Sequence, residues 1–167
     1  MEEASGDIGA FLKCVDLFQD LDDNELAALI AKAKDERYED KHFIFKEGEM
    51  GDAMFVVLDG IVKVVKMVTG NKFKTLVTMG IGDFFGEMAL LDGQPRSAST
   101  VAHGVARVLR IGRDEFSALM GENPYLGLKV VIRLARNLTD RLRKTNVQVV
   151  EMASWNLQQR EINKLQP

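Results

Sequence analysis

The middle of the chain, from Glu36 to Ile111, is divided into short apolar runs separated by glycines. Several of these runs alternate or are rich in valine, which is typical of half-buried β-strands. The runs are His42–Phe45, Met54–Leu58, Ile61–Val68, Phe73–Met79, Val101–His103 and Val105–Ile111. Regularly spaced short strands with glycine turns predict a β-barrel or jelly roll, and Thr69–Lys72 has the residues of a hairpin tip.

Helical periodicity flanks this region on both sides. Ile8–Phe18 and Leu26–Lys34 carry apolar residues at helical spacing, and the stretch Asp22–Glu25 between them has the residue types of a helix cap. We expect the polar residues 1–7 to be frayed. After the β-region, Arg113–Met120 is again helical, before a Gly-Glu-Asn-Pro sequence interrupts it.

The stretch from Leu128 to Gln166 contains neither glycine nor proline and is rich in helix-forming residues. Its residues at alternating steps of three and four form a heptad seam that continues for more than three heptads. The seam consists of Leu128, Val131, Ala135, Leu138, Leu142, Thr145, Val149 and Met152. This pattern predicts a long helix that pairs with a second copy in a homodimer. The alternative is a helix packed only on its own β-domain.

Composition narrows the class of protein. The 167 residues have a net charge of −3, which gives no electrostatic reason to expect nucleic acid or an anionic membrane as a partner. A single cysteine, Cys14, fits a reducing compartment, and the acidic N-terminus does not resemble a signal peptide. No apolar run approaches the length of about 20 residues that a membrane span needs. We therefore expect a soluble, cytoplasmic protein.

The stretch Phe84–Ser99 carries the residue types that a small anionic, sugar-bearing ligand requires. Gly86 lacks a Cβ, so the backbone can approach a ligand closely. Glu87 offers two acceptor oxygens for ribose hydroxyls, and Met88–Leu91 has room for one helical turn, whose N–H groups favour an anion. Arg96 supplies a planar, permanently charged fork for a phosphate.

This stretch resembles the phosphate-binding cassette of cyclic nucleotide-binding domains, the family of the catabolite activator protein and the regulatory subunits of cyclic AMP-dependent kinase. Phe85–Leu91 and Pro95–Ser99 match the family pattern without a gap. The resemblance implies an α+β, mainly β fold: an eight-stranded β-roll or jelly-roll barrel with N-terminal helices and a long C-terminal helix. We expect residues 1–125 to form this domain, 126–160 the dimerisation helix and 161–167 a tail.

The resemblance also implies a role for each cassette residue. Arg96 would bind the phosphate with help from the Ser97 hydroxyl, and Glu87 would accept a hydrogen bond from the ribose. The expected ligand-binding residues of the cassette are Gly86, Glu87, Met88, Ala89, Leu90, Arg96, Ser97 and Ala98. The plainer alternatives are a solvated turn arginine, a small packed serine and an exposed acid at a helix N-terminus.

Recognition of the base is expected from the long helix. Aligning it with the corresponding helix of the family places Thr145 and Asn146 where a threonine and a serine reach the purine. Thr145 has a plainer interpretation, in which its hydroxyl bonds the backbone of its own helix. Asn146 departs from the family's serine. A serine at position 97 favours cyclic AMP over cyclic GMP, without excluding the latter.

Other chemistry is poorly supported. His42 and His103 lie far apart in a chain with one cysteine, so we expect no metal site, and no pairing of a nucleophile with a base suggests an enzyme. About a dozen residues follow Trp155, too few for a DNA-reading domain of ~50 residues. The leading hypothesis is a cyclic nucleotide sensor that signals through its C-terminal helix to an unknown downstream protein. The alternative is a dimeric scaffold or effector-binding domain of the same fold that has lost nucleotide binding, and a β-barrel enzyme ranks third.

Overall fold

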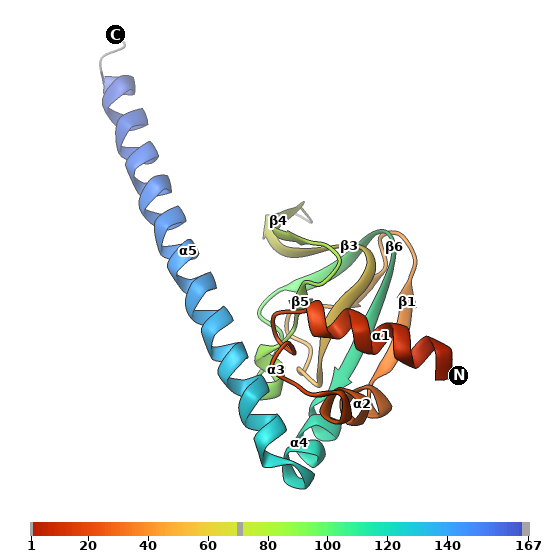
Figure 1. Ribbon diagram of the computed structural model, residues 1–167. Coiled ribbons are helices and arrows are strands. Elements are labelled where there is room, and N and C mark those ends of the chain that lie inside the picture. The colour runs from red at the N-terminus through yellow and green to blue at the C-terminus, as the bar shows by residue number, and fades with distance from the viewer. Residues whose placement is uncertain (1, 70–71, 165–167) are drawn as a thin grey trace. The chain divides into compact units, whose positions relative to one another are not determined.

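The computed structural model describes residues 2–69 and 72–164, and it divides into two compact units, Met1–Val130 and Val131–Pro167. The first unit contains all of the described strands (Figure 1). In chain order the elements are α1 (Glu2–Cys14), α2 (Asp23–Lys32), β1 (Lys34–Tyr38), β2 (Phe43–Phe45), β3 (Ala53–Thr69), β4 (Lys72–Met79), β5 (Phe84–Phe85), α3 (Met88–Leu91), β6 (Ser99–Gly112), α4 (Arg113–Glu122) and α5 (Pro124–Lys164).

The strands form one antiparallel sheet in the order β1-β6-β3-β4, with β2 paired to β6 and β5 paired to β3. This confirms the mainly β fold with flanking helices. The path of strands is open, so the sheet does not close into the barrel that the sequence predicts. β3 and β6 are its longest strands, and they carry most of the pairing between distant parts of the chain.

The described residues contain six strands, where the family resemblance implies eight. Two pairs of predicted apolar runs are each one continuous strand, and β1 and β5 are strands that no apolar run predicts. The runs on either side of Gly60 form β3, and the runs on either side of Gly104 form β6. Both glycines have positive φ, +81° and +77°, and the β3–β6 ladder resumes with a shifted register beyond Asp59. A Cβ at Gly60 would lie 2.2 Å from the Val105 carbonyl oxygen, so the strands bend together there without ending.

β1 begins at Lys34, where the predicted helix Leu26–Lys34 ends, and it covers a segment in which the sequence predicts no strand. Its sequence, Lys-Asp-Glu-Arg-Tyr, has no apolar alternation, yet it pairs with β6 over its whole length, from Lys34 opposite Arg110 to Tyr38 opposite Ala106. The side chains of β1 are exposed or half-buried, as expected at the edge of a sheet. A strand of this kind is specified by its neighbour and gives little signal in its own sequence.

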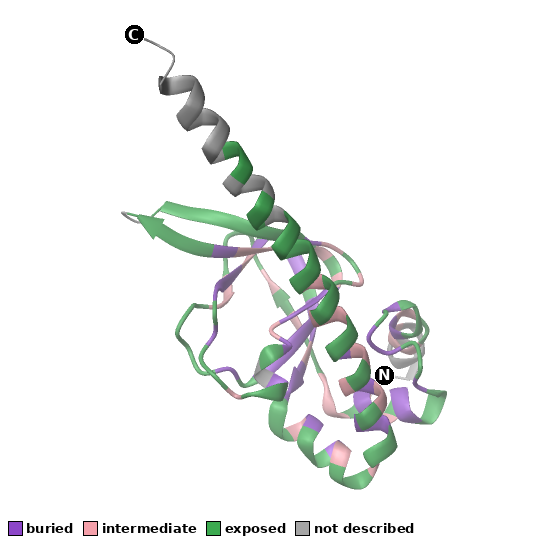
Figure 2. Ribbon diagram, turned by 90° about the vertical axis from the view of Figure 1, so that its left-hand side faces the viewer, coloured by how far each residue is buried: buried purple, intermediate pink, exposed green. Residues whose placement is uncertain are grey.

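The hydrophobic core lies between the bent strands and is rich in aromatic rings. Phe55 and Phe85 stack with their centroids 5.2 Å apart, and Phe45 contacts both rings at 5.8 and 5.9 Å. The buried members of this core cluster are Ala53, Phe55, Val57, Val62, Met79, Phe85, Ala102, Ala106 and Val108. Figure 2 shows the buried residues concentrated in the strands and helices of the first unit, while nearly all of β4 is exposed.

The helices of the first unit begin where local signals place them, with some shifts. Asp22 and Glu25 form the expected capping box of α2. α1 begins already at Glu2, so the predicted frayed N-terminus is helical. Figure 1 shows α2 and α4 side by side at one end of the sheet. α5 begins at Pro124, a favoured first helical residue, and it is helical through Lys164, beyond the predicted start of the tail at residue 161.

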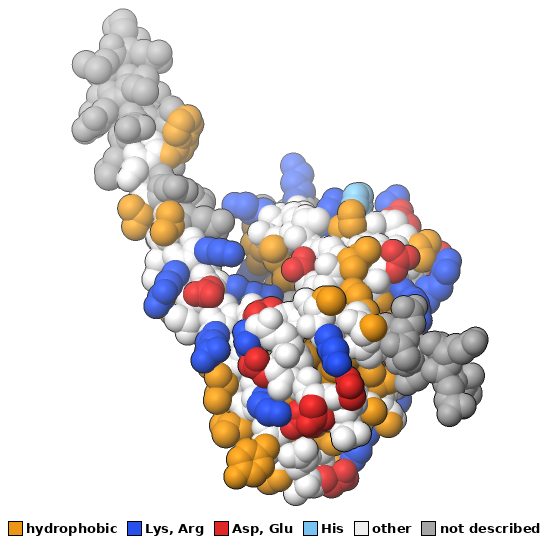
Figure 3. Space-filling view, viewed as in Figure 1, with side chains coloured by type: hydrophobic (Ala, Val, Ile, Leu, Met, Phe, Trp, Pro, Cys, Tyr) orange, Lys and Arg blue, Asp and Glu red, His pale blue; other side chains and the backbone are white. Residues whose placement is uncertain are grey.

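Charges of both signs are interspersed over the face of the first unit that Figure 3 shows. None of the helices in the described part of the chain is long and apolar enough to cross a membrane. The predicted hairpin tip joins β3 to β4 as expected, since Thr69 pairs with Lys72, but residues 70 and 71 lie outside the described residues.

Candidate functional site

The cassette runs from a short strand through one helical turn to the start of β6. β5 is fixed by pairing with β3, where Phe85 lies opposite Phe55. Gly86 has a φ of +71°, and this left-handed conformation turns the chain from β5 toward α3. The Glu87 carbonyl accepts a hydrogen bond from the Leu90 N–H at 3.1 Å, which closes the helical turn. The sequence predicts the helical turn Met88–Leu91 correctly, whereas the strand β5 and the left-handed conformation of Gly86 are not among its predictions.

Arg96 is buried against the other half of the cassette, with its side chain only 4% exposed. Its Nη1 donates to the Gly86 carbonyl oxygen at 3.2 Å, and its Nη2 donates to Asp52 Oδ1 at 3.2 Å. The guanidinium lies 4.1 Å from the centroid of the Phe45 ring, within the range of a cation–π interaction. The plain alternative of an arginine in a solvated turn does not fit this burial.

The Nε of Arg96 is buried and has no hydrogen-bond partner among the described residues. Burial lowers the pKa of Arg96, and the nearby Asp52 carboxylate opposes this effect. A guanidinium remains charged at neutral pH even so. Asp52 is shared, because its Oδ2 also accepts a hydrogen bond from Arg110 at 2.6 Å. Two arginines, Arg96 and Arg110, thus share the Asp52 carboxylate, so Asp52 is not available to Arg96 alone.

The remaining cassette residues take different positions. Glu87 is 5% exposed and occupies the N-cap position of α3, so it is not the exposed acid of the plainer interpretation. Leu90 and Ala98 are also buried. Met88 and Ser97 are exposed. The backbone of Ala89 lies within α3, while its side chain lies outside the described residues.

Thr145 and Asn146 lie in the second unit, on α5, and both are exposed. The Thr145 hydroxyl donates to the Arg141 carbonyl of its own helix at 2.9 Å. This is the bond of the plainer interpretation, and it satisfies the hydroxyl without a ligand. The contact of these two residues with a base therefore stays a prediction.

Sequence reasoning did not single out Asp52 and Phe45, although both contact Arg96. Asp52 follows a glycine-rich turn and Phe45 ends a short strand, so their sequence signals are those of ordinary turn and core residues. The described residues contain no group of three or more histidine, cysteine, aspartate or glutamate side chains placed to hold a metal ion.

The family model described as cyclic nucleotide-binding domain matches residues 35–123, which include the whole cassette. The chain belongs to the cyclic nucleotide-binding domain family. A crystal structure of a cyclic nucleotide-binding domain from Methylobacillus flagellatus is similar to it, with a TM-score of 0.78 and 30% identity over 90% of this chain and 84% of that one.

Two curated relatives carry the same domain within longer proteins. A cGMP-dependent protein kinase of Caenorhabditis briggsae is 34% identical over 114 residues, which are 67% of this chain and 15% of the kinase. A CRP-like cAMP-activated global transcriptional regulator of Mycobacterium tuberculosis is 28% identical over 136 residues, 81% of this chain and 59% of the regulator. The chain therefore spans less than two thirds of the length of each of these relatives.

Proposed function

We propose that this cyclic nucleotide-binding domain binds cyclic AMP, or cyclic GMP with lower preference, and acts as a sensor without catalytic activity of its own. The observation that carries the proposal is the buried, charged guanidinium of Arg96: its Nη1 and Nη2 are bonded within the protein, while its Nε has no partner among the described residues. An unsatisfied buried donor is unfavourable, and a phosphate oxygen would satisfy it.

The rest of the cassette supports a phosphate and ribose clamp. Glu87 is a buried acid next to Gly86, whose carbonyl already bonds Arg96. We assign Glu87 and the Gly86 backbone to the ribose. Arg96, the Ser97 hydroxyl and the N–H groups of Ala89, Leu90 and Ala98 are assigned to the phosphate, with Met88 as an apolar neighbour.

The proposal also covers which residues contact the base of the nucleotide and how binding is signalled to other proteins. Thr145 and Asn146 would contact the base after Thr145 exchanges its helix-backbone bond for the ligand. The names of the relatives include both a cAMP-activated regulator and a cGMP-dependent kinase, so the preference for cyclic AMP rests on Ser97. Binding would alter the long helix, which signals to a downstream protein as part of a homodimer. We place this protein in the cytoplasm on the evidence of its single cysteine.

Calorimetric titration with both cyclic nucleotides tests the proposal. Arg96→Ala should raise the dissociation constant at least about 30-fold, about 2 kcal/mol, through loss of a charge-assisted phosphate contact. The matched control is Arg107→Ala, which removes an arginine that pairs with Asp35 between β6 and β1, outside the cassette. Thermal unfolding without ligand separates misfolding from loss of binding.

Absence of heat and of any thermal shift at millimolar cyclic AMP and cyclic GMP would refute the function. The scaffold alternative would then stand, since it retains the fold and the dimer but binds no nucleotide. Mass spectrometry of denatured protein adds an independent check by showing whether a nucleotide co-purifies.

A further inference from the structure

The segment that carries Arg96 and Ser97 is held on one side by the 46–52 loop, which connects β2 to β3. The Gly48 N–H donates to the Arg96 carbonyl at 2.9 Å, and the Arg96 N–H donates to the Glu49 carbonyl at 2.8 Å. The Gly51 N–H donates to the Gln94 carbonyl at 3.3 Å. These bonds fix the backbone as far as the Arg96 carbonyl and leave the next carbonyl, that of Ser97, to another partner.

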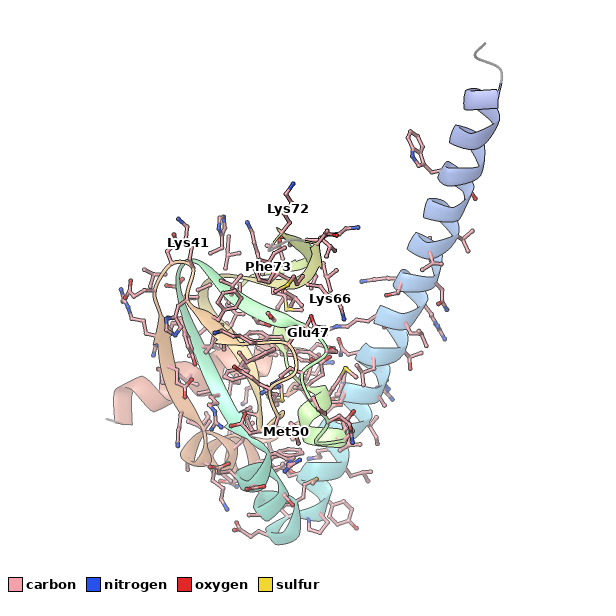
Figure 4. The ribbon with its side chains drawn as sticks, turned by 180° about the vertical axis from the view of Figure 1, so that it is seen from behind. Lys41, Glu47, Met50, Lys66, Lys72 and Phe73 are labelled. Carbon is pink, nitrogen blue, oxygen red and sulfur yellow. The ribbon has the colours of Figure 1, made fainter. Side chains whose placement is uncertain are left out.

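That partner is Lys66 of β3. Its Nζ donates to the Ser97 carbonyl oxygen at 3.1 Å and forms an ion pair with Glu47 Oε1, also at 3.1 Å. Figure 4 shows Lys66 and Glu47 next to each other beside β3. Lys66 follows the buried Val65 on β3, and its own residue is exposed, so its long side chain reaches the Ser97 carbonyl along the surface of the strand. Glu47 is itself anchored, because its N–H donates to Ser99 Oγ at 2.9 Å.

The Ser97 carbonyl and the Ala98 N–H belong to one planar peptide group and point in opposite directions. A cation that holds the carbonyl therefore also fixes the direction of the N–H. It polarises the same peptide, which strengthens the N–H as a donor. Ala98 N–H is one of the groups that we assign to the phosphate, so the peptide bond connects the lysine to a group of the proposed site.

We propose that Lys66, held in place by Glu47, is a positioning residue that aims the Ala98 N–H at one exocyclic phosphate oxygen. The inference rests on the proposed nucleotide-binding function and deepens it. The Lys66 and Glu47 side chains are 48% and 39% exposed, and ion pairs this open to solvent contribute little to stability. Loss of Lys66 should therefore affect ligand binding far more than folding.

The test is calorimetric titration of the full chain with cyclic AMP and with its two phosphorothioate diastereomers, in which sulfur replaces one or the other exocyclic oxygen. Lys66→Met should weaken cyclic AMP binding about 5- to 20-fold, the usual effect of one hydrogen bond near a charge. It should also change the ratio of the two diastereomer affinities at least about threefold, because the Ala98 N–H meets only one of the two oxygens.

Lys74→Met is the matched control. Lys74 lies directly opposite Lys66 on β4, so this change removes the same charge from the neighbouring strand. Lys66→Arg should restore both the affinity and the ratio to within about twofold of the unaltered chain, since it keeps a cationic donor. Glu47→Gln keeps Lys66 but removes its ion-pair partner, so we expect a change of the diastereomer ratio between those of the unaltered chain and Lys66→Met. This variant also tests the inference if Lys66→Met does not fold.

An unchanged diastereomer ratio in Lys66→Met and Glu47→Gln, or an equal loss of affinity in Lys74→Met, would overturn this inference while leaving the nucleotide-binding function intact. Failure of the unaltered chain to bind any of the three ligands would instead overturn the proposed function, and the inference with it.

Discussion

At the scale of single residues, the site depends on how closely Arg96 approaches Gly86. A Cβ on Gly86 would lie 2.8 Å from Arg96 Nη1 and 3.2 Å from the Ala53 carbonyl oxygen, and its φ of +71° is strained for any other residue. Gly86 therefore has two separate reasons to be glycine, the backbone conformation and the space that the guanidinium fills.

Substitution of Gly86 by alanine separates these two reasons. Gly104→Ala is the control, because Gly104 has a similar φ of +77° and nothing within 4 Å of an added Cβ. We expect Gly104→Ala to cost about 1–2 kcal/mol for the left-handed conformation, and Gly86→Ala at least about 1 kcal/mol more for the displaced arginine. Urea unfolding measures both values. Equal losses would show that the approach of Arg96 to Gly86 contributes nothing to stability.

At the scale of elements, the first turns of α5 are tied to α2 by a buried acid. Lys129 Nζ donates to both oxygens of Glu25, at 2.9 and 2.7 Å, and the same carboxylate accepts the Asp22 N–H in the capping box. Glu25 is only 7% exposed, and burying a carboxylate is unfavourable unless it is paired and hydrogen-bonded, as it is here. A Cβ on Gly127 would lie 2.4 Å from Met120 Cγ, which shows how closely α5 packs on α4 at this point.

The link between Lys129 and Glu25 predicts a pH dependence of stability. The hydrogen bond to Glu25 raises the pKa of Lys129 above its ordinary value. A raised pKa adds stability that is fully present below the unfolded lysine pKa of about 10.4 and is lost as the pH rises through the folded value.

Lys129→Met should therefore lower the free energy of unfolding at pH 8, and its deficit relative to the unaltered chain should shrink as the pH rises above about 10.4. Denaturant titrations over this range measure the deficit. The control Lys74→Met removes an exposed lysine from β4 and should show no deficit that changes in this way. A deficit of the same size at every pH would contradict the role of the lysine charge.

At the scale of the whole molecule, the long helix is the element that the proposed homodimer requires. α5 contains 41 residues, a length of about 60 Å at the usual helical rise. Several members of the heptad seam in the second unit are exposed in the single chain, among them Leu142 and Val149. Exposed apolar residues in a heptad pattern are typical of a helix that pairs with another copy.

A charge in the seam should separate the two copies. Leu142→Lys should shift the mass in light scattering from two chains toward one, because a lysine at a central seam position is costly to bury. Val147→Lys is the control, since Val147 is 58% exposed, against 60% for Leu142, but lies outside the seam. Equal masses for the two variants, or a monomeric unaltered chain, would argue against pairing through the seam.

Short-range signals in the sequence were sufficient to predict the helical turn of the cassette, the cap of α2, four of the six described strands and the long helix, because each depends on residues within a few positions of one another. Within Phe84–Ser99, local chemistry predicts the helical turn Met88–Leu91 that the structure contains, whereas β5 is defined by its pairing with β3. The same locality explains the errors in the strand count. Gly60 and Gly104 look like strand ends, and β1 has no apolar alternation, so only pairing with β6 reveals what these segments are.

The partners of the cassette come from its three-dimensional packing. Asp52 is 44 residues from Arg96, and Lys66 is 31 residues from Ser97. They meet because the register of β3 against β6 and the course of the 46–52 loop bring separate segments together, and no local pattern encodes that register. Local chemistry thus identifies the residues suited to a phosphate and a ribose. Long-range strand pairing supplies the carboxylate, the aromatic ring and the lysine that hold those residues in position.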